Sequence, residues 1–60
     1  MQLAEAKHAI CETAGFYDRF QVKDVMQWLG DDSQIVRDAI RELVKEGLLV
    51  RVKRGIYEWR

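Results

Sequence analysis

The sequence predicts a small α+β domain, mainly α-helical, built from three helices and a C-terminal β-hairpin. Two observations predict it. Up to Gly47, apolar residues recur at spacings of three and four, the period of one helix face, and each periodic run is followed by glycine. After Gly47, two short runs of strand-forming residues flank Lys53-Arg54-Gly55, a pattern typical of a hairpin. With 60 residues, we expect one domain over 1–60.

The first helix is predicted over residues 3–14. Its apolar face consists of Leu3, Ala6, Ile10 and Ala14. Gly15 is expected to end it in the left-handed conformation, and Cys11, beside this face, is expected to be buried. The connector that follows is rich in aromatic residues, and we expect it to place both Phe16 and Phe20 on the core, in a brief extended strand.

The second and third helices are predicted over residues 22–29 and 35–45, with Gly30 and Gly47 as their stops. Their apolar faces consist of Val22, Val25, Met26 and Leu29 in the second and Val36, Ile40 and Leu43 in the third. Asp32 is the expected N-cap of the third helix, because its carboxylate can accept hydrogen bonds from the free amides of the first turn.

In the hairpin, we expect Val52 to lie opposite Ile56, with a three-residue loop in which Gly55 takes a positive φ. Trp59 ends the second strand, and Trp28 lies off the apolar face of the second helix. For each tryptophan the sequence leaves open a place on the core or a place in a contact between chains.

The net charge is zero, but the charges are unevenly distributed. Residues 1–34 hold three basic and six acidic side chains, and residues 35–60 hold seven basic and four acidic ones. Such asymmetry is one indication of an anionic partner. One cysteine and one histidine can form neither an internal disulfide nor a four-ligand zinc site. Without a secretory pattern or a long apolar run, the sequence favours an intracellular protein that makes no membrane contact.

The run from Val22 to Gly30, followed by Ile35 to Leu49, resembles the winged helix-turn-helix superfamily. The leucine–glycine pair ending the second helix, the valine–arginine pattern of the third and the glycine with two apolar residues after it carry the resemblance. The run from Arg51 to Tyr57 is similar to the wing of small winged-helix domains in bacterial transcriptional regulators and antitoxins. The sequence departs from this pattern at two positions. Asp31 stands where the pattern usually has an apolar residue, and Gln21 stands where it usually has threonine or serine.

The resemblance implies that the third helix, about 33–46, lies in the major groove of DNA, and that the wing, about 48–59, reaches the backbone or the minor groove. The implied DNA-binding residues are Ser33, Gln34, Arg37, Asp38, Arg41, Lys53 and Arg54. Further candidates for phosphate contacts are Arg19, Lys23, Lys45 and Arg51. Arginine can bind guanine O6 and N7 with two hydrogen bonds, and glutamine can bind adenine in the same way.

Each of these assignments has a simpler alternative. Arg37 and Arg41 also suit a solvated helix face, and Lys53 and Arg54 also suit an exposed strand edge that resists aggregation. Asp38 is the least expected residue on a DNA-facing helix. It either accepts a hydrogen bond from a cytosine amino group or indicates that this face meets protein.

The sequence therefore predicts a double-stranded DNA-binding module of a transcription regulator or mobile-element protein, in the cytoplasm or on the nucleoid, with no cofactor or metal. Tight binding by a neutral domain would require a homodimer or attachment to a larger protein. No arrangement of residues indicates an enzyme. Two alternatives remain: a winged-helix protein-interaction module without nucleic acid, and binding of RNA or single strands through Tyr17, Tyr57 or Trp59 as stacking platforms.

Overall fold

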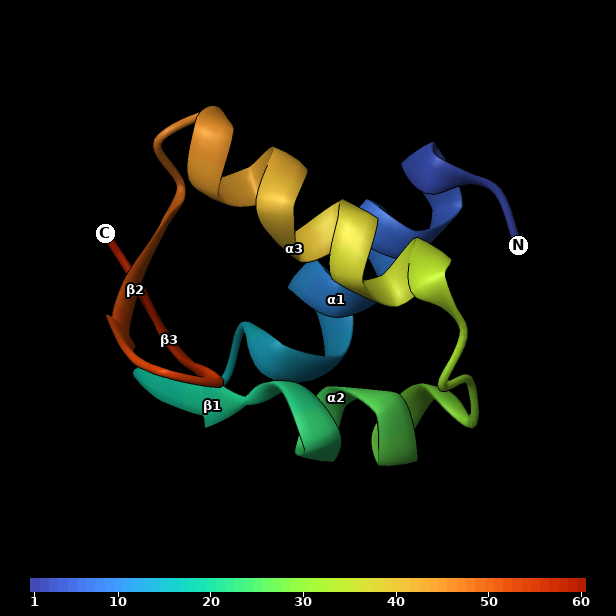
Figure 1. The fold of residues 1–60 in the computed structure, drawn as a ribbon, viewed down its shortest axis with the longest axis horizontal. Coiled ribbons are helices and arrows are strands. Elements are labelled where there is room, and N and C mark those ends of the chain that lie inside the picture. The colour runs from blue at the N-terminus through green and yellow to red at the C-terminus, as the bar shows by residue number, and fades with distance from the viewer.

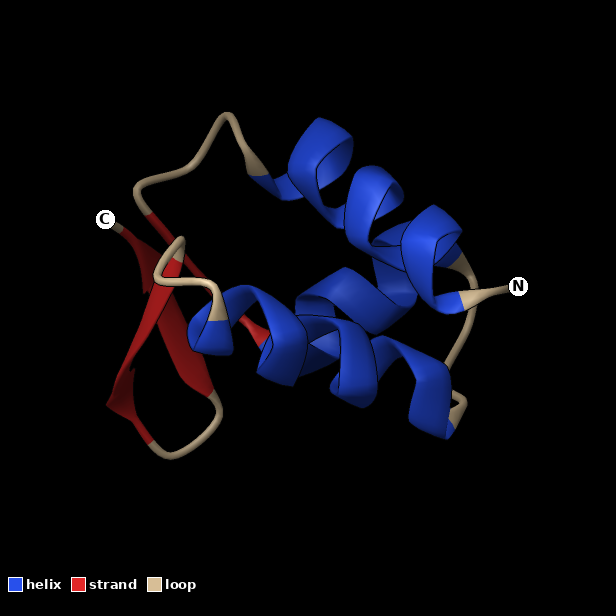
Figure 2. Cartoon of the chain, turned by 90° about the horizontal axis from the view of Figure 1, so that it is seen from above, coloured by secondary structure: helices blue, strands red, loops and turns tan.

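A computed structural model describes all residues, 1–60. Three helices form the body of the molecule, and a three-stranded antiparallel sheet lies at the end away from the N-terminus (Figures 1 and 2). The elements in chain order are α1 (Leu3–Ala14), β1 (Arg19–Gln21), α2 (Val22–Leu29), α3 (Gln34–Lys45), β2 (Leu49–Lys53) and β3 (Ile56–Trp59). The predicted three helices and C-terminal hairpin are confirmed, and the short strand β1 joins the hairpin in one sheet.

The helices begin and end close to their predicted residues, with two local corrections. Ser33, not Asp32, is the N-cap of α3. The Asp31 carboxylate accepts the backbone N–H of Ser33 at 2.8 Å, and this Asx-type turn moves the helix start one residue along the chain. Gly15 is right-handed, with φ −65°, and not left-handed as expected. Glycine is required at this position because a Cβ there would clash with the carbonyl oxygen of Cys11.

The sheet has the order β1-β3-β2, so the last strand lies between the other two. The hairpin register differs from the prediction: Lys53, not Val52, lies opposite Ile56, with an irregularity between Arg51 and Lys53. The tight turn that remains contains Gly55 at φ +78°, as expected. The irregularity takes up the extra residue, as a β-bulge does.

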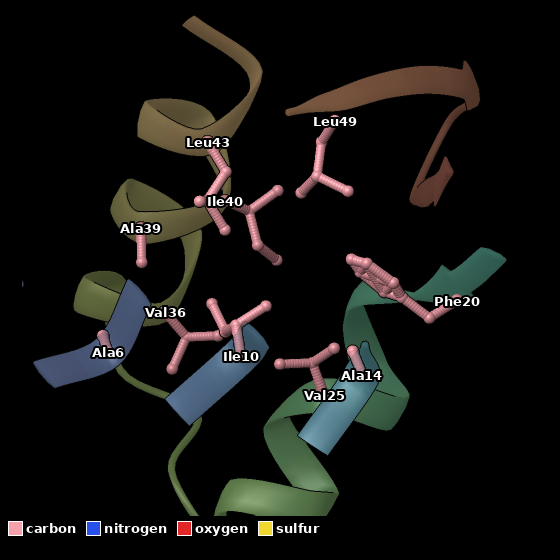
Figure 3. Close-up of a cluster of buried hydrophobic side chains, with 10 residues drawn as sticks. All are labelled: Ala6, Ile10, Ala14, Phe20, Val25, Val36, Ala39, Ile40, Leu43 and Leu49. Atoms are coloured by element: carbon pink, nitrogen blue, oxygen red, sulfur yellow. The ribbon is translucent and has the colours of Figure 1, made fainter. Parts of the chain in front are cut away.

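The core lies where α1, α2, α3 and the sheet meet (Figure 3). Its ten buried residues are all apolar: Ala6, Ile10, Ala14, Phe20, Val25, Val36, Ala39, Ile40, Leu43 and Leu49. Phe20 is 4% exposed, whereas Phe16 is 89% exposed, so only one of the two predicted core phenylalanines is buried. Cys11 is exposed, contrary to expectation. It lies about 100° around the helix from Ile10, outside the face that α2 and α3 cover.

The two tryptophans have different environments. Trp59 stacks on Phe20 with ring centroids 5.9 Å apart, and its indole N–H donates to the carbonyl of Ala14 at 3.0 Å. It therefore belongs to the core and ties β3 to the end of α1. Trp28 is 41% exposed and stacks on Tyr17 at 5.0 Å, on the surface. No helix has the length and apolar character needed to cross a membrane.

Candidate nucleic-acid interface

The face of α3 that points away from the core carries the polar residues expected of a recognition helix. Val36, Ile40 and Leu43 are buried on its inner side. Ala39 is buried with them, and the residues on the opposite side of this helix, which repeats every 3.6 residues, face outward. They are the predicted set Ser33, Gln34, Arg37, Asp38 and Arg41, of which all but the half-buried Asp38 are exposed.

A cleft of about 430 Å³ lies between this face of α3 and the turn of the hairpin. Its lining residues are Val22, Arg37, Ile40, Arg41, Arg54, Gly55 and Tyr57. The structure thus brings together three of the predicted DNA-binding arginines from two elements distant in sequence. No carboxylate lines the cleft, and neither Arg37 nor Arg54 forms an ion pair. The cleft is accordingly positive and suited to an anion.

Backbone hydrogen bonds hold the hairpin turn in place beside the helices. The N–H of Val22, the first residue of α2, donates to the carbonyl of Gly55 at 3.0 Å. β3 also pairs with β1, which places Tyr57 opposite Phe20, with ring centroids 6.3 Å apart. The position of Arg54 relative to α3 therefore depends on the sheet and on the start of α2, and not on the flexibility of an isolated hairpin.

A second hollow, of about 320 Å³, lies on the other side of the same turn. It is lined by Gln21, Val22, Lys23, Arg54, Gly55 and Ile56. The structure therefore places the predicted candidate Lys23 beside Arg54. Together the two hollows connect α3, the hairpin turn and the start of α2.

The remaining predicted basic residues do not line the cleft. Arg19 on β1 lies opposite Glu58 on β3, and its Nη2 binds the Glu58 carboxylate at 2.9 Å. Lys45 lies in the last turn of α3, and Arg51 lies on β2. Lys53 ends β2 next to the turn and is exposed.

Asp38 interacts with two neighbours on the outward face of α3. Its Oδ1 accepts a hydrogen bond from Gln34 Nε2 at 3.1 Å and lies 3.8 Å from Arg41 Nη1. Because both partners are predicted DNA-binding residues, the carboxylate orients two side chains of the candidate interface.

Tyr57 lines the cleft, whereas the sequence suggested it only as a stacking platform for RNA or single strands. Its half-buried side chain contributes to the cleft wall beside the arginines. The sequence signal was the aromatic residue two positions after Gly55 in the wing, but its position opposite Phe20 depends on the pairing of β1 with β3. The exposed aromatics Phe16, Tyr17 and Trp28 lie outside the cleft lining.

Two titratable groups with shifted pKa values lie outside the cleft and support the fold. A hydrogen bond to Glu46 raises the pKa of Lys7 and connects α1 to the end of α3. Hydrogen bonds from Ser33 lower the pKa of Asp31 in the turn between α2 and α3. No group of three or more histidine, cysteine, aspartate or glutamate side chains could hold a metal ion.

The α2–turn–α3 unit, followed by a hairpin whose tip lies beside α3, defines a winged helix-turn-helix protein, a class that regulates transcription by binding DNA. A family model described as transcriptional regulator, AbiEi antitoxin matches residues 20–58, and the chain belongs to this family. The matched range contains every residue that lines the cleft. The family is defined by regulation rather than by catalysis. No match to the chain was found among curated proteins or among solved structures.

Proposed function

We propose that this protein binds double-stranded DNA as a transcription-regulating module, with α3 in the major groove and the β2–β3 wing on the backbone or the minor groove. One observation carries the proposal: Arg37 and Arg41 of α3 and Arg54 of the wing turn line one cleft that no carboxylate enters. Arg37 and Arg54 have no ion-pair partner, and Arg41 lies 3.8 Å from the Asp38 carboxylate. The three guanidinium groups on this concave surface attract a polyanion and can bind it with paired hydrogen bonds.

The two sides of the cleft suit different parts of DNA. Arg37, Arg41 and Gln34 project from a helix, the element that fits the major groove and reads the base edges there. Arg54 and Lys53 lie at a hairpin turn, which suits phosphate contacts. Lys23 at the start of α2 adds a further phosphate contact on the same side as Arg54.

The zero net charge limits the affinity of one copy. About four to six phosphate contacts are available, so the salt dependence of binding is expected to be moderate. High affinity then requires two copies on paired half-sites, or attachment to a larger protein. A DNA partner places the protein in the cytoplasm or on the nucleoid.

The test is charge reversal in the cleft. The double variant Arg37→Glu/Arg41→Glu should abolish the mobility shift of mixed-sequence duplex while leaving the helical circular dichroism unchanged. The matched control compares the single variants Arg37→Glu and Arg60→Glu, which alter the net charge equally. Arg60 is exposed and lies outside the cleft, so Arg60→Glu should retain measurable binding. Unchanged binding by the cleft variant would refute the proposal.

Exposed aromatic residues support a second candidate function, a protein-interaction module. Phe16 is 89% exposed, and the stacked pair of Tyr17 and Trp28 lies on the surface. Aromatic residues are enriched in protein interfaces. If the protein shows no salt-sensitive binding to duplex at two salt concentrations, this function is favoured. Preference for a single strand over duplex in competition would instead favour stacking on exposed rings.

A further inference from the structure

Asp38 is the only acidic residue among the predicted DNA-binding residues of α3, and its side chain remains accessible to solvent. Its side chain is 43% exposed, although it contacts Gln34 and Arg41. Resting on the DNA-binding function proposed above, we infer that Asp38 is a specificity-determining residue that, together with Arg41, reads one C·G base pair.

DNA offers few hydrogen-bond donors to a carboxylate. An ionised aspartate is a hydrogen-bond acceptor only. Phosphate oxygens, guanine O6 and N7 and thymine O4 are also acceptors, so Asp38 is repelled by the backbone and by most base edges. The donors in the major groove are the amino groups at cytosine N4 and adenine N6. The carboxylate therefore disfavours any DNA sequence that places no amino group opposite it.

Between these two bases, cytosine fits better. Adenine presents the acceptor N7 beside its amino group, which repels the second carboxylate oxygen, whereas the cytosine amino group has no acceptor next to it on the same base. The paired guanine presents O6 and N7, the atoms that arginine binds with two hydrogen bonds. One C·G pair thus offers a donor for Asp38 and two acceptors for Arg41.

The geometry on α3 allows one base pair to meet both side chains. Residues three apart lie on neighbouring positions of a helix surface, with Cβ atoms about 5–6 Å apart. Asp38 Oδ1 and Arg41 Nη1 are 3.8 Å apart before DNA is bound. The two side chains therefore already lie together, and the N4 and O6 groups they would bind are themselves adjacent within the pair.

The experiment selects binding sequences from a random duplex library with the wild-type protein and with Asp38→Asn. The wild type should enrich a motif with an invariant C·G pair. Asparagine binds adenine N6 and N7 with two hydrogen bonds, so the variant should shift that position from cytosine towards adenine. The ratio of affinities for the selected duplex and a mixed-sequence duplex should fall by about tenfold, because a mismatched pair costs about that factor or more.

Glu42→Gln is the matched control. It removes the same charge from the same helix. Glu42, however, lies outside the predicted DNA-binding set: its side chain is half-buried, and its negative charge helps to raise the pKa of Lys7 in α1. This control should bind mixed-sequence duplex more tightly through its added net charge and still select the wild-type motif. Equal melting temperatures of the three proteins show that folding does not explain a difference.

The outcomes separate the two proposals. If the wild type binds duplex and Asp38→Asn selects the same motif, or Glu42→Gln alters the motif as much, the inference about Asp38 is wrong while DNA binding stands. Enrichment of a motif without the C·G pair overturns it in the same way. If the wild type binds no duplex at all, the DNA-binding function fails as well.

Discussion

Replacement of Arg54 by alanine should weaken the salt dependence of DNA binding, because this side chain provides one cation of the cleft. Arg54 forms no ion pair, and the turn that holds it is tied to α2 by the Val22–Gly55 hydrogen bond of 3.0 Å. Arg37 and Arg41 are assigned to base edges and Arg19 is bound to Glu58, which leaves five predicted basic residues for phosphate contacts: Lys23, Lys45, Arg51, Lys53 and Arg54. Loss of one phosphate contact changes the slope of log affinity against log salt by about 0.9.

With five contacts the slope is about −4.5, so the affinity should fall about 500-fold between 50 and 200 mM salt. With four contacts the slope is about −3.6, and the fall should be about 150-fold. Fluorescence anisotropy with a labelled duplex at several salt concentrations measures both slopes.

The control for this prediction is Arg19→Ala, which removes the same charge. Arg19 is already bound to Glu58 at 2.9 Å and does not line the cleft. The slope of log affinity against log salt for Arg19→Ala should therefore equal that of the wild type. If Arg19→Ala and Arg54→Ala lower the slope equally, the cleft has no special role and binding follows net charge. If Arg54→Ala leaves the slope unchanged, the wing turn does not contact phosphate.

Three further predictions concern the fold that supports the cleft. Leu43 is 1% exposed, so Leu43→Ala should lower the free energy of unfolding by about 2–5 kcal/mol, which is most of the stability of a domain this small. A thermal melt that shows little loss of melting temperature would contradict this. Gly15→Ala should lower the melting temperature because the new Cβ would clash with the carbonyl oxygen of Cys11, although glycine-to-alanine changes at right-handed positions usually stabilise. A higher melting temperature would show that the clash does not occur. The pKa of Asp31 is lowered from 3.8 by hydrogen bonds from Ser33, so its contribution to stability is present above pH 3.8 and lost as the pH falls through the lower folded-state pKa. The difference in stability between wild type and Asp31→Ala, measured by denaturation across pH, should therefore vanish at low pH; a constant difference would contradict this.

The predictions that succeeded depend on short stretches of chain. The limits of α1 and α2 follow from the three-and-four spacing of apolar residues and from the glycines after them, and both helices have the predicted bounds. The N-cap of α3 was predicted one residue too early, because either Asp32 or Ser33 is an acceptable cap by residue type. The side chain of Asp31, which binds the N–H of Ser33, decides between them.

The predictions that failed concern side chains whose environment comes from distant residues. Phe16 and Phe20 are equally apolar and four residues apart, but only Phe20 lies on the strand that pairs with β3, and it is the one that is buried. Arg19 and Arg54 were both candidates for DNA contacts by charge, and both stay predictions, but the structure gives them different surroundings. The sheet places Arg19 against Glu58, and the hairpin turn places Arg54 beside α3.

The sequence by itself determined the class of this protein: three helices, a hairpin and a basic C-terminal half, because side-chain periodicity, glycine stops and charge are properties of contiguous residues. Only the tertiary structure decided which basic residues line the same cleft. Arg37 and Arg41 meet Arg54 because β3 pairs between β1 and β2 and the carbonyl of Gly55 accepts the N–H of Val22. The β1–β3 pairing and the Val22–Gly55 hydrogen bond join segments more than thirty residues apart, and no local pattern encodes them.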